Sequence, residues 1–296
     1  MQMLEKFYIL FILIGILGLY QFAVSGFYEE ARAQSITYSP VPYYDLMCKT
    51  PEMCLALETE ESSSAISQAP AAGSDFCLNV PILLYHHIQP QSLAIEKKQT
   101  ALSVDSGIFD AQMNYLKYSG YTAITAEDLV NALSSHGNLP AKSILITIDD
   151  GYKDNFLYAF PILQKYGLIG NFMVPSGLLG GEDFMTWDDL KQISSSGFAF
   201  VVNHTWSHFP LPQGSVEKIK MEAGIARSDL VRATGQKINT FAYPYGSFDD
   251  KSIAVLRSEG FTGAFSTING TTQCESFIMS LHRTHIGNAP LSSYGL

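Results

Sequence analysis

The stretch that most constrains the fold of this chain is residues 144–152, which read ILITIDDGY. Its first five residues are apolar or β-branched, a pattern typical of a strand that is buried on both faces. This strand leads directly into two carboxylates, Asp149 and Asp150, and then into a glycine. Burying two neighbouring like charges costs several kcal/mol each unless partners compensate them. The stretch therefore predicts a bound cation.

The two aspartates are expected to have different roles. Because side chains alternate along a strand, Asp149 and Asp150 point in different directions. One of them can hold a metal ion while the other stays free for proton transfer. The simpler alternative is that both only cap a helix that starts at Lys153.

Composition limits the classes of protein to consider. A chain of 296 residues with 47% hydrophobic content can bury one large core, so we expect one main domain with appendages. The formal net charge is -10, and the sequence has no cluster of Lys and Arg. Nucleic acid demands a basic surface, so it is not an expected partner.

The N-terminus has the pattern of an export signal. Residues 7–23 are almost continuously apolar, Lys6 precedes them, and residues 31–33 offer a small-x-small cleavage site. The run is slightly shorter than the about 20 residues of a spanning helix. We expect residues 1–33 to be a signal peptide, with an uncleaved membrane anchor as the alternative and the sole contact with a membrane. The predicted location is outside the cytoplasm: periplasmic, secreted or anchored facing outside.

The segment that follows looks like a linker. Residues 34–79 contain several prolines and the run ETEESSS, a composition that cannot bury much surface. We expect a poorly ordered extension there and a folded domain over residues 80–296. An even number of cysteines in an exported chain favours disulfides, and among the three connectivities we favour Cys48–Cys54 with Cys77–Cys274.

Strand and helix patterns alternate through the predicted domain. This alternation is typical of an α/β fold with parallel strands, and both a doubly wound sheet and a barrel fit it. The expected strands are residues 80–85, 144–148, 170–174, 198–203, 240–243 and 263–266. The expected helices are residues 103–119, a segment capped by Thr125, and residues 155–166, 187–195, 215–234 and 249–259.

Polar groups follow the ends of several predicted strands, and these ends converge in both architectures. His204 and His208 are spaced i, i+4, which predicts two imidazoles on one side of a helical turn. Two imidazoles and one carboxylate form a site typical of catalytic zinc. We favour Asp150 as the third ligand and Asp149 as the base, although the spacing does not decide between them. Histidines on a surface loop are the alternative.

Three motifs in order carry a family resemblance: TIDDG at residues 147–151, HTWSH at 204–208 and FAYPYG at 241–246. They resemble the first three motifs of the polysaccharide deacetylases of carbohydrate esterase family 4. The resemblance implies a deformed (β/α) barrel and metal-dependent removal of acetyl groups from a glycan. It implies that Asp149 is the catalytic base. It also implies that one divalent ion, zinc or else cobalt or nickel, is held by Asp150, His204 and His208.

The segment PILLYHHI at residues 81–88 is similar to the start of the branch that includes the poly-N-acetylglucosamine deacetylases. This similarity implies His86 as the catalytic acid, with His87 as a poorer candidate. A core histidine bonded to a backbone carbonyl is the alternative for His86. Many family members carry an arginine where this chain has Ala242, and Arg283 is expected to hold Asp149 in its place unless it is an ordinary surface residue.

The same resemblance assigns groups around the substrate. The backbone N–H of Tyr245 is expected to hold the oxyanion. Trp206, Tyr243 and Phe209 are expected to form an apolar wall for an acetyl group or a sugar, with simple core packing as the alternative. The predicted function is an N-deacetylase that acts on an N-acetylglucosamine polysaccharide. The alternatives are an O-acetyl esterase on xylan-like or other acetylated glycans, and an inactive glycan-binding module.

Overall fold

The computed structural model describes residues 75–296. The predicted signal peptide or anchor, nearly all of the predicted linker, and Cys48 and Cys54 lie outside the described residues. The end of the predicted linker is ordered, because Cys77–Asn79 forms strand β1. Across residues 75–296, none of the helices has both the length and the apolar character needed to span a membrane.

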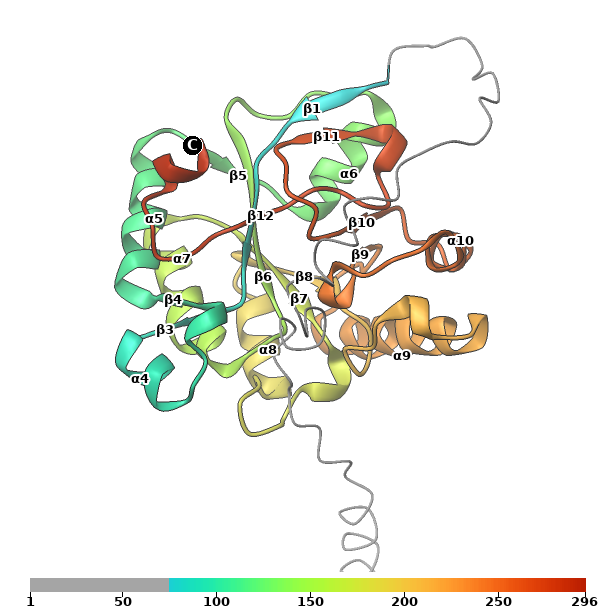
Figure 1. Cartoon of the computed structure of the whole chain (residues 1–296), viewed down its shortest axis with the longest axis horizontal. Coiled ribbons are helices and arrows are strands. Elements are labelled where there is room, and N and C mark those ends of the chain that lie inside the picture. The colour runs from blue at the N-terminus through green and yellow to red at the C-terminus, as the bar shows by residue number, and fades with distance from the viewer. Residues whose placement is uncertain (1–74) are drawn as a thin grey trace, which may run out of the picture. The chain divides into compact units, whose positions relative to one another are not determined.

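A curled sheet of parallel strands forms the centre of the molecule, with helices around it (Figure 1). The strand order is β10-β9-β8-β7-β6-β2-β12, and β5 pairs with β6 beside this path. The strands are β2 (Ile82–Tyr85), β5 (Thr122–Ala123), β6 (Ser143–Asp149), β7 (Gly170–Val174), β8 (Ala199–Asn203), β9 (Thr240–Ala242), β10 (Gly263–Phe265) and β12 (Thr284–His285).

The C-terminal segment joins the two edges of this sheet. Phe265 of β10 bridges to Leu281, and the Ser266 N–H donates to the Leu281 carbonyl at 2.9 Å. Only a few residues later, β12 pairs in parallel with β2 at the other edge. The predicted deformed (β/α) barrel is thereby confirmed, and the doubly wound alternative is excluded because such a sheet has two open edges.

Most predicted helices form within a residue or two of their expected bounds. The predicted helix at residues 103–119 starts later, because Ser103–Asp105 forms β4 beside β3 (His87–Gln89). The short helix α4 (Gln91–Glu96) was not predicted. The remaining helices are α5 (Ser106–Tyr118), α6 (Ala126–Ser135), α7 (Phe160–Tyr166), α8 (Trp187–Ser194), α9 (Val216–Thr234) and α10 (Asp250–Ser258).

Local capping explains these bounds. The Thr125 hydroxyl accepts from the Asp128 N–H while the Asp128 carboxylate accepts from the Thr125 N–H, which is a complete capping box for α6. Asp105 accepts from the first turn of α5 in the same manner. At the C-terminal end of α7, Gly167 adopts a left-handed φ of 63° and ends the helix.

Strand β6 is buried along its whole length, and its two faces have different surroundings. Ile146 and its neighbours two residues away pack with α5, α7 and α8, whereas Leu145 belongs to the core cluster that contains Phe241 and Phe265. Because side chains alternate, Thr147 and Asp149 share the face of Leu145. The strand thus carries Asp149 on its inward face.

The predicted disulfide Cys77–Cys274 is confirmed. It joins β1 to β11 (Thr272–Cys274) at directly opposed positions of an antiparallel pair, and it links residues 197 apart in sequence. A cross-link over so long a loop removes much conformational freedom from the unfolded chain.

We expect the double variant Cys77→Ser, Cys274→Ser to lose about 2–5 kcal/mol of unfolding free energy, because the unfolded state regains the entropy of that loop. Urea denaturation followed by circular dichroism measures this loss. An unchanged midpoint in the double variant would contradict the expectation.

Candidate active site

The chemical groups lie at the carboxyl ends of the parallel strands β2, β6 and β8. β6 ends at Asp149, and its neighbour β2 ends at Tyr85, which pairs with Ile148. His204 directly follows β8. Since parallel strands all point the same way, these ends meet at one face of the barrel.

Asp150, His204 and His208 converge on one point. The Nε2 atoms of His204 and His208 lie 3.3 Å and 3.1 Å from Asp150 Oδ1. Their candidate ligand atoms all lie within 4.8 Å of one another, the spacing of a group that could share a metal ion. Asp150 and His204 are buried, and the His208 side chain is partly exposed.

The donor chemistry of these residues fits a cation. His204 Nδ1 lies 2.8 Å from the Ala242 carbonyl oxygen, so Nδ1 carries the hydrogen and Nε2 presents a lone pair when the ring is neutral. Asp150 Oδ1 is buried and has no hydrogen-bond partner. A divalent ion satisfies the exposed lone pairs and the orphaned oxygen together, as two histidines and a carboxylate do in catalytic zinc sites.

Electrostatics support this grouping. Burial alone would raise the pKa of Asp150, but the contacts with His208 and His204 outweigh it and hold that pKa well below its usual range. Burial alone would likewise lower the pKa of His208, yet the Asp150 charge outweighs it and raises that pKa. The carboxylate is therefore ionised and ready to bind a cation.

The histidines are not brought together in the predicted way. Residues 204–208 form an irregular loop and not a helical turn. Thr205 and His208 adopt left-handed φ angles of 66° and 58°, which turn the chain so that both rings face Asp150. The prediction of a shared helical face was wrong because hydrogen bonds from outside the loop hold these unfavourable angles.

Asp149 pairs with Arg283 inside the barrel. The guanidinium donates to both carboxylate oxygens, at 2.7 Å to Oδ1 and 2.9 Å to Oδ2, and also to Thr147 Oγ1 and the Ser266 carbonyl. Both side chains are buried. Burial raises the pKa of Asp149, but Arg283 and His204 outweigh it and lower that pKa. Arg283 is thus no surface residue, and it keeps Asp149 charged.

His86 and His87 have different surroundings. His87 is buried, its Nδ1 lies 2.6 Å from Asp154 Oδ2, and its ring stacks on Tyr152. His86 follows β2 and stacks on His285 with ring centroids 5.3 Å apart. Burial lowers the pKa of His86, while the charges of Asp150 and Asp149 oppose that shift. Of these two histidines, His86 is therefore the one that interacts with the charges of Asp149 and Asp150.

The remaining aromatic candidates lie at different depths. Tyr243 is fully buried, and its hydroxyl donates to the Met279 carbonyl at 2.9 Å, so its ring supports the site from inside the core. Tyr245 is 40% exposed and packs edge-on against His208 with centroids 4.6 Å apart. Trp206 is 39% exposed, and Phe209 packs at the edge of the core. Tyr245 and Trp206 are therefore the most exposed of these four rings.

Glu222 was not predicted from the sequence, and Asn203, a polar residue at the end of a predicted strand, had no assigned role. Glu222 is completely buried on α9 and accepts hydrogen bonds from the loop at residues 204–208. Asn203 is also buried, donates to the Ala223 carbonyl and accepts from the Thr205 N–H. The available signal was a charged residue among the apolar positions of an amphipathic helix.

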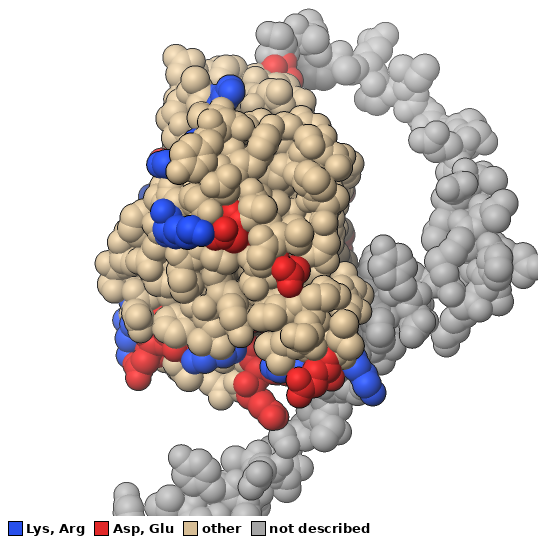
Figure 2. Space-filling model, turned by 90° about the vertical axis from the view of Figure 1, so that its left-hand side faces the viewer, with Lys and Arg blue, Asp and Glu red and all other residues tan. Residues whose placement is uncertain are grey.

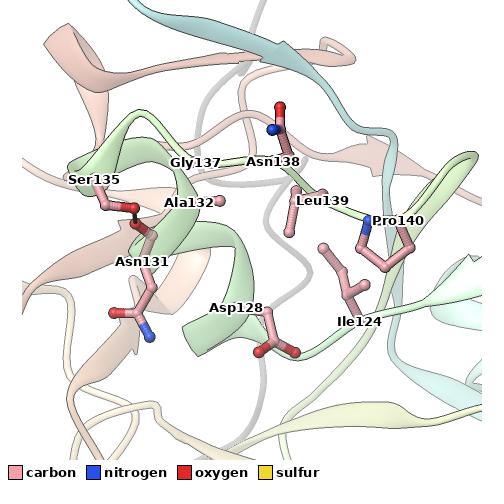
Figure 3. Close-up of a pocket in the computed structure, with 9 residues that line it drawn as sticks. All are labelled: Ile124, Asp128, Asn131, Ala132, Ser135, Gly137, Asn138, Leu139 and Pro140. Atoms are coloured by element: carbon pink, nitrogen blue, oxygen red, sulfur yellow. Dashed lines mark hydrogen bonds between the residues drawn. The ribbon is translucent and has the colours of Figure 1, made fainter.

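A surface cavity of about 420 Å³ lies elsewhere, beside α6 and residues 137–140 (Figure 3). These residues precede β6, so the cavity lies toward the amino end of that strand. Asp128 supplies a carboxylate to the lining, but this carboxylate already accepts from the Thr125 N–H in the cap of α6. The Ser135 hydroxyl, also in the lining, donates to the Asn131 carbonyl. The cavity offers no reacting group comparable to those around Asp150.

Charge is sparse on one face of the molecule. Figure 2 shows that most of the described surface on this face is uncharged and that the charged side chains along its lower edge have both signs. The described part of this face therefore has no basic stripe of the kind that tracks a phosphate backbone.

Comparison with known proteins agrees with the fold and the motifs. Residues 136–264 match the sequence model of the polysaccharide deacetylase family. YxkH of Bacillus subtilis, named among the polysaccharide deacetylases, is 26% identical over 208 residues, which are 70% of this chain and 71% of that protein. The deacetylase PplD of Streptococcus pyogenes, solved in complex with acetate, has a TM-score of 0.67 and 28% identity over 71% of this chain and 93% of that chain.

A further relative is the poly-β-1,6-N-acetyl-D-glucosamine N-deacetylase of Escherichia coli K12, 23% identical over 250 residues. The match covers 70% of this chain but only 36% of that enzyme. Fold, site and relatives together define a hydrolase built on a (β/α) barrel. Residues 136–264 match the polysaccharide deacetylase family, and the chain is similar in fold and sequence to proteins named as its members.

The buried pair yields a stability prediction. Arg283→Gln leaves Asp149 buried without a charge partner, so we expect the unfolding free energy to fall by about 3–5 kcal/mol. Urea denaturation at neutral pH measures the change. Adding Asp149→Asn to this variant removes the unpaired charge and is expected to recover part of the loss.

Lys97→Gln is a matched control for this prediction, because it breaks the exposed ion pair with Asp183 and should cost at most about 1 kcal/mol. A loss for Arg283→Gln no larger than that of the control would mean that the buried pair does not hold the barrel interior.

Proposed function

We propose that this protein is a metal-dependent N-deacetylase that acts on a polysaccharide containing N-acetylglucosamine. The observation that carries the proposal is the convergence of two histidine Nε2 atoms on the orphaned, buried Asp150 Oδ1, beside a second aspartate held by Arg283. A set of metal ligands with one further carboxylate beside it, which binds no metal and can accept a proton, suits hydrolysis of an unreactive amide. The relatives named for polysaccharide substrates support the substrate class.

Each residue has a distinct task in the proposed reaction. Asp150, His204 and His208 would hold one divalent ion, with zinc preferred over cobalt or nickel. When bound, this ion supplies Lewis-acid chemistry that polarises a carbonyl and lowers the pKa of water to about 7. Asp149 accepts the proton of the attacking water, and its two hydrogen bonds from Arg283 keep the carboxylate ionised and oriented.

The other groups act on the acetylated nitrogen and its carbonyl. The backbone N–H of Tyr245 donates to the oxygen that becomes negative. His86 gives a proton to the leaving nitrogen, which an amide requires far more than an ester does. The exposed ring of Trp206 contacts the sugar or the acetyl methyl, and the buried ring of Tyr243 supports the site from the core, where it packs against Phe241 and Phe248.

The proposed setting is outside the cytoplasm, with the apolar run at residues 7–23 acting as a signal or an anchor. The three-part organisation, with a leader over residues 1–33, a linker that ends before β1 and a deacetylase domain from β1 onward, belongs to the same proposal. A glycan polymer is too large to enter a cell, so an exported enzyme suits it.

The proposal predicts metal-dependent loss of acetyl groups. The full-length chain, stripped with a chelator and then given Zn²⁺, Co²⁺ or Ni²⁺, should deacetylate β-1,6-linked N-acetylglucosamine oligomers, as measured by mass spectrometry. Asp149→Asn should lower turnover by about 10²–10⁴-fold while the metal content stays unchanged, because it removes the proton acceptor and leaves the three candidate ligands in place. Asp150→Asn, the matched control one residue away, should lose the metal as well. Full turnover by Asp149→Asn would rule out Asp149 as the base, and absence of turnover by the wild type with all three metals would leave only a glycan-binding role.

A second prediction separates amide from ester chemistry. His86→Ala should slow cleavage of acetylated glucosamine oligomers by about 10²–10⁴-fold, since their nitrogen leaves only when protonated. Cleavage of acetylated xylan or of a simple acetyl ester should fall much less. Comparison of the two rates in one enzyme preparation gives the result. Equal losses, or the absence of any amide cleavage by the wild type, would favour the O-acetyl esterase alternative.

A further inference from the structure

The loop between the two candidate histidine ligands is held from outside by a buried carboxylate. Glu222 of α9 is completely buried, although apolar residues occupy the neighbouring buried positions of the helix, such as Ile219 and Ala226. Burying a carboxylate costs several kcal/mol unless hydrogen bonds and a counter-charge compensate it. A hydrophobic side chain would pack this position at lower cost, so the charge points to a task other than filling the core.

The partners of Glu222 identify this task. Its Oε2 accepts from the backbone N–H groups of Trp206 at 3.0 Å and Ser207 at 2.8 Å. Its Oε1 accepts from the Ser207 hydroxyl at 2.7 Å and pairs with Lys218 at 2.7 Å. Three of these four donors belong to the loop between His204 and His208.

That loop has a backbone it would not adopt alone. Thr205 and His208 both have φ near +60°, a region that costs a non-glycine residue of order 1–3 kcal/mol. Such angles persist only where the surroundings over-determine them. Glu222 bonds the two residues that lie between these strained positions, so it supplies part of the force that keeps them.

The other side of the loop rests on η4 (Ser176–Leu178). The Gly177 N–H donates to the Trp206 carbonyl at 2.7 Å, and the Ser176 N–H donates to the Thr205 carbonyl at 3.2 Å. A Cβ at Gly177 would lie 2.7 Å from the Trp206 indole and from the Trp206 carbonyl oxygen, so this glycine permits the close approach. The loop is therefore clamped between η4 on one side and the buried Glu222 carboxylate on the other.

The two histidines depend on this clamp to different degrees. His204 directly follows β8 and is oriented by its own contact with the Ala242 carbonyl. His208 follows Ser207 immediately, and its ring reaches Asp150 only because the chain turns there. Fixing Ser207 therefore fixes the distance between the second imidazole and the first.

We propose that Glu222 is a positioning residue that sets His208 at binding distance for the metal ion, through its bonds to Trp206 and Ser207. The inference rests on the proposed function, since it assigns Glu222 a role toward the ion that Asp150, His204 and His208 would hold. Groups that orient metal ligands typically contribute about 10–100-fold to metal affinity.

The test measures metal affinity and metal geometry and does not use turnover. Co²⁺ is titrated into the full-length, metal-free chain against a competing chelator, and the visible absorption of bound Co²⁺ reports its coordination. Glu222→Gln should bind Co²⁺ about 10–100-fold more weakly and shift the absorption, because one acceptor oxygen is replaced by a donor that faces N–H groups. Its thermal unfolding without metal shows whether the fold is retained.

Glu259→Gln is the matched control. This residue pairs with Lys220 of the same helix α9 and contacts no residue of the loop, so its variant should keep both the affinity and the spectrum. Should Glu222→Gln fail to fold, Ser207→Ala removes one donor while leaving the helix intact, and it should weaken binding in the same direction by a smaller factor.

Wild-type affinity and spectrum in Glu222→Gln, or in Ser207→Ala where the first variant is unfolded, would overturn the inference. An equal loss in Glu222→Gln and Glu259→Gln would also overturn it, because a general loosening of α9 would then be the cause. Failure of the wild type to bind one equivalent of Co²⁺, or unchanged binding in Asp150→Asn, would instead remove the metal site on which the proposed function depends.

Discussion

The structure depends on the separate compensation of two adjacent buried carboxylates. Asp149 and Asp150 end a strand with no exposed residue, so neither charge is hydrated well enough to stand alone. Arg283 compensates the first from within the barrel, while His204 and His208 face the second across the strand ends. The two carboxylates therefore have different contact partners, although His204 lowers the pKa of both.

Closure of the sheet is what makes the first compensation possible. Arg283 lies 134 residues after Asp149 and immediately before β12, whose pairing with β2 completes the curl of the strands. An open sheet with the same strands would leave this arginine at an edge, far from the carboxylate. The barrel is thus more than a scaffold for loops, because its last strand delivers the group that keeps the proposed base ionised.

Much of this arrangement follows from the sequence. The exceptions are features that tertiary contacts create and that leave no local pattern. Helices with clear caps, such as the one that begins after Thr125, were predicted to within a residue or two because capping is local. The convergence of Asp149, Asp150 and His204 also follows from strand direction alone. The short strands β1, β3, β4, β5, β11 and β12 were missed, since two or three residues carry no periodic signal.

The loop at residues 204–208 shows the same limit within the site. An i, i+4 spacing of His204 and His208 is consistent with a helical turn, and only tertiary contacts reveal the left-handed angles that replace it. Those contacts come from Glu222, which is in a different element and was hidden in a helix of ordinary composition. Residues that act through hydrogen bonds to a distant backbone leave no spacing pattern, so sequence analysis finds the ligands before it finds what orients them.

The alanine at position 242 is consistent with the assignment of Arg283 to Asp149. An arginine in the third motif would approach Asp149 from the strand that follows His204, whereas here that position contributes only a carbonyl, which orients the imidazole of His204. Arg283 instead reaches Asp149 from the chain just before β12. On the inward face of β6 it also donates to Thr147 Oγ1. The metal ligand and the proposed base are therefore oriented by different strands, so displacement of one need not disturb the other. Barrel closure and base orientation, in contrast, depend on the same short segment, residues 281–285, so loosening of this segment would impair both at once.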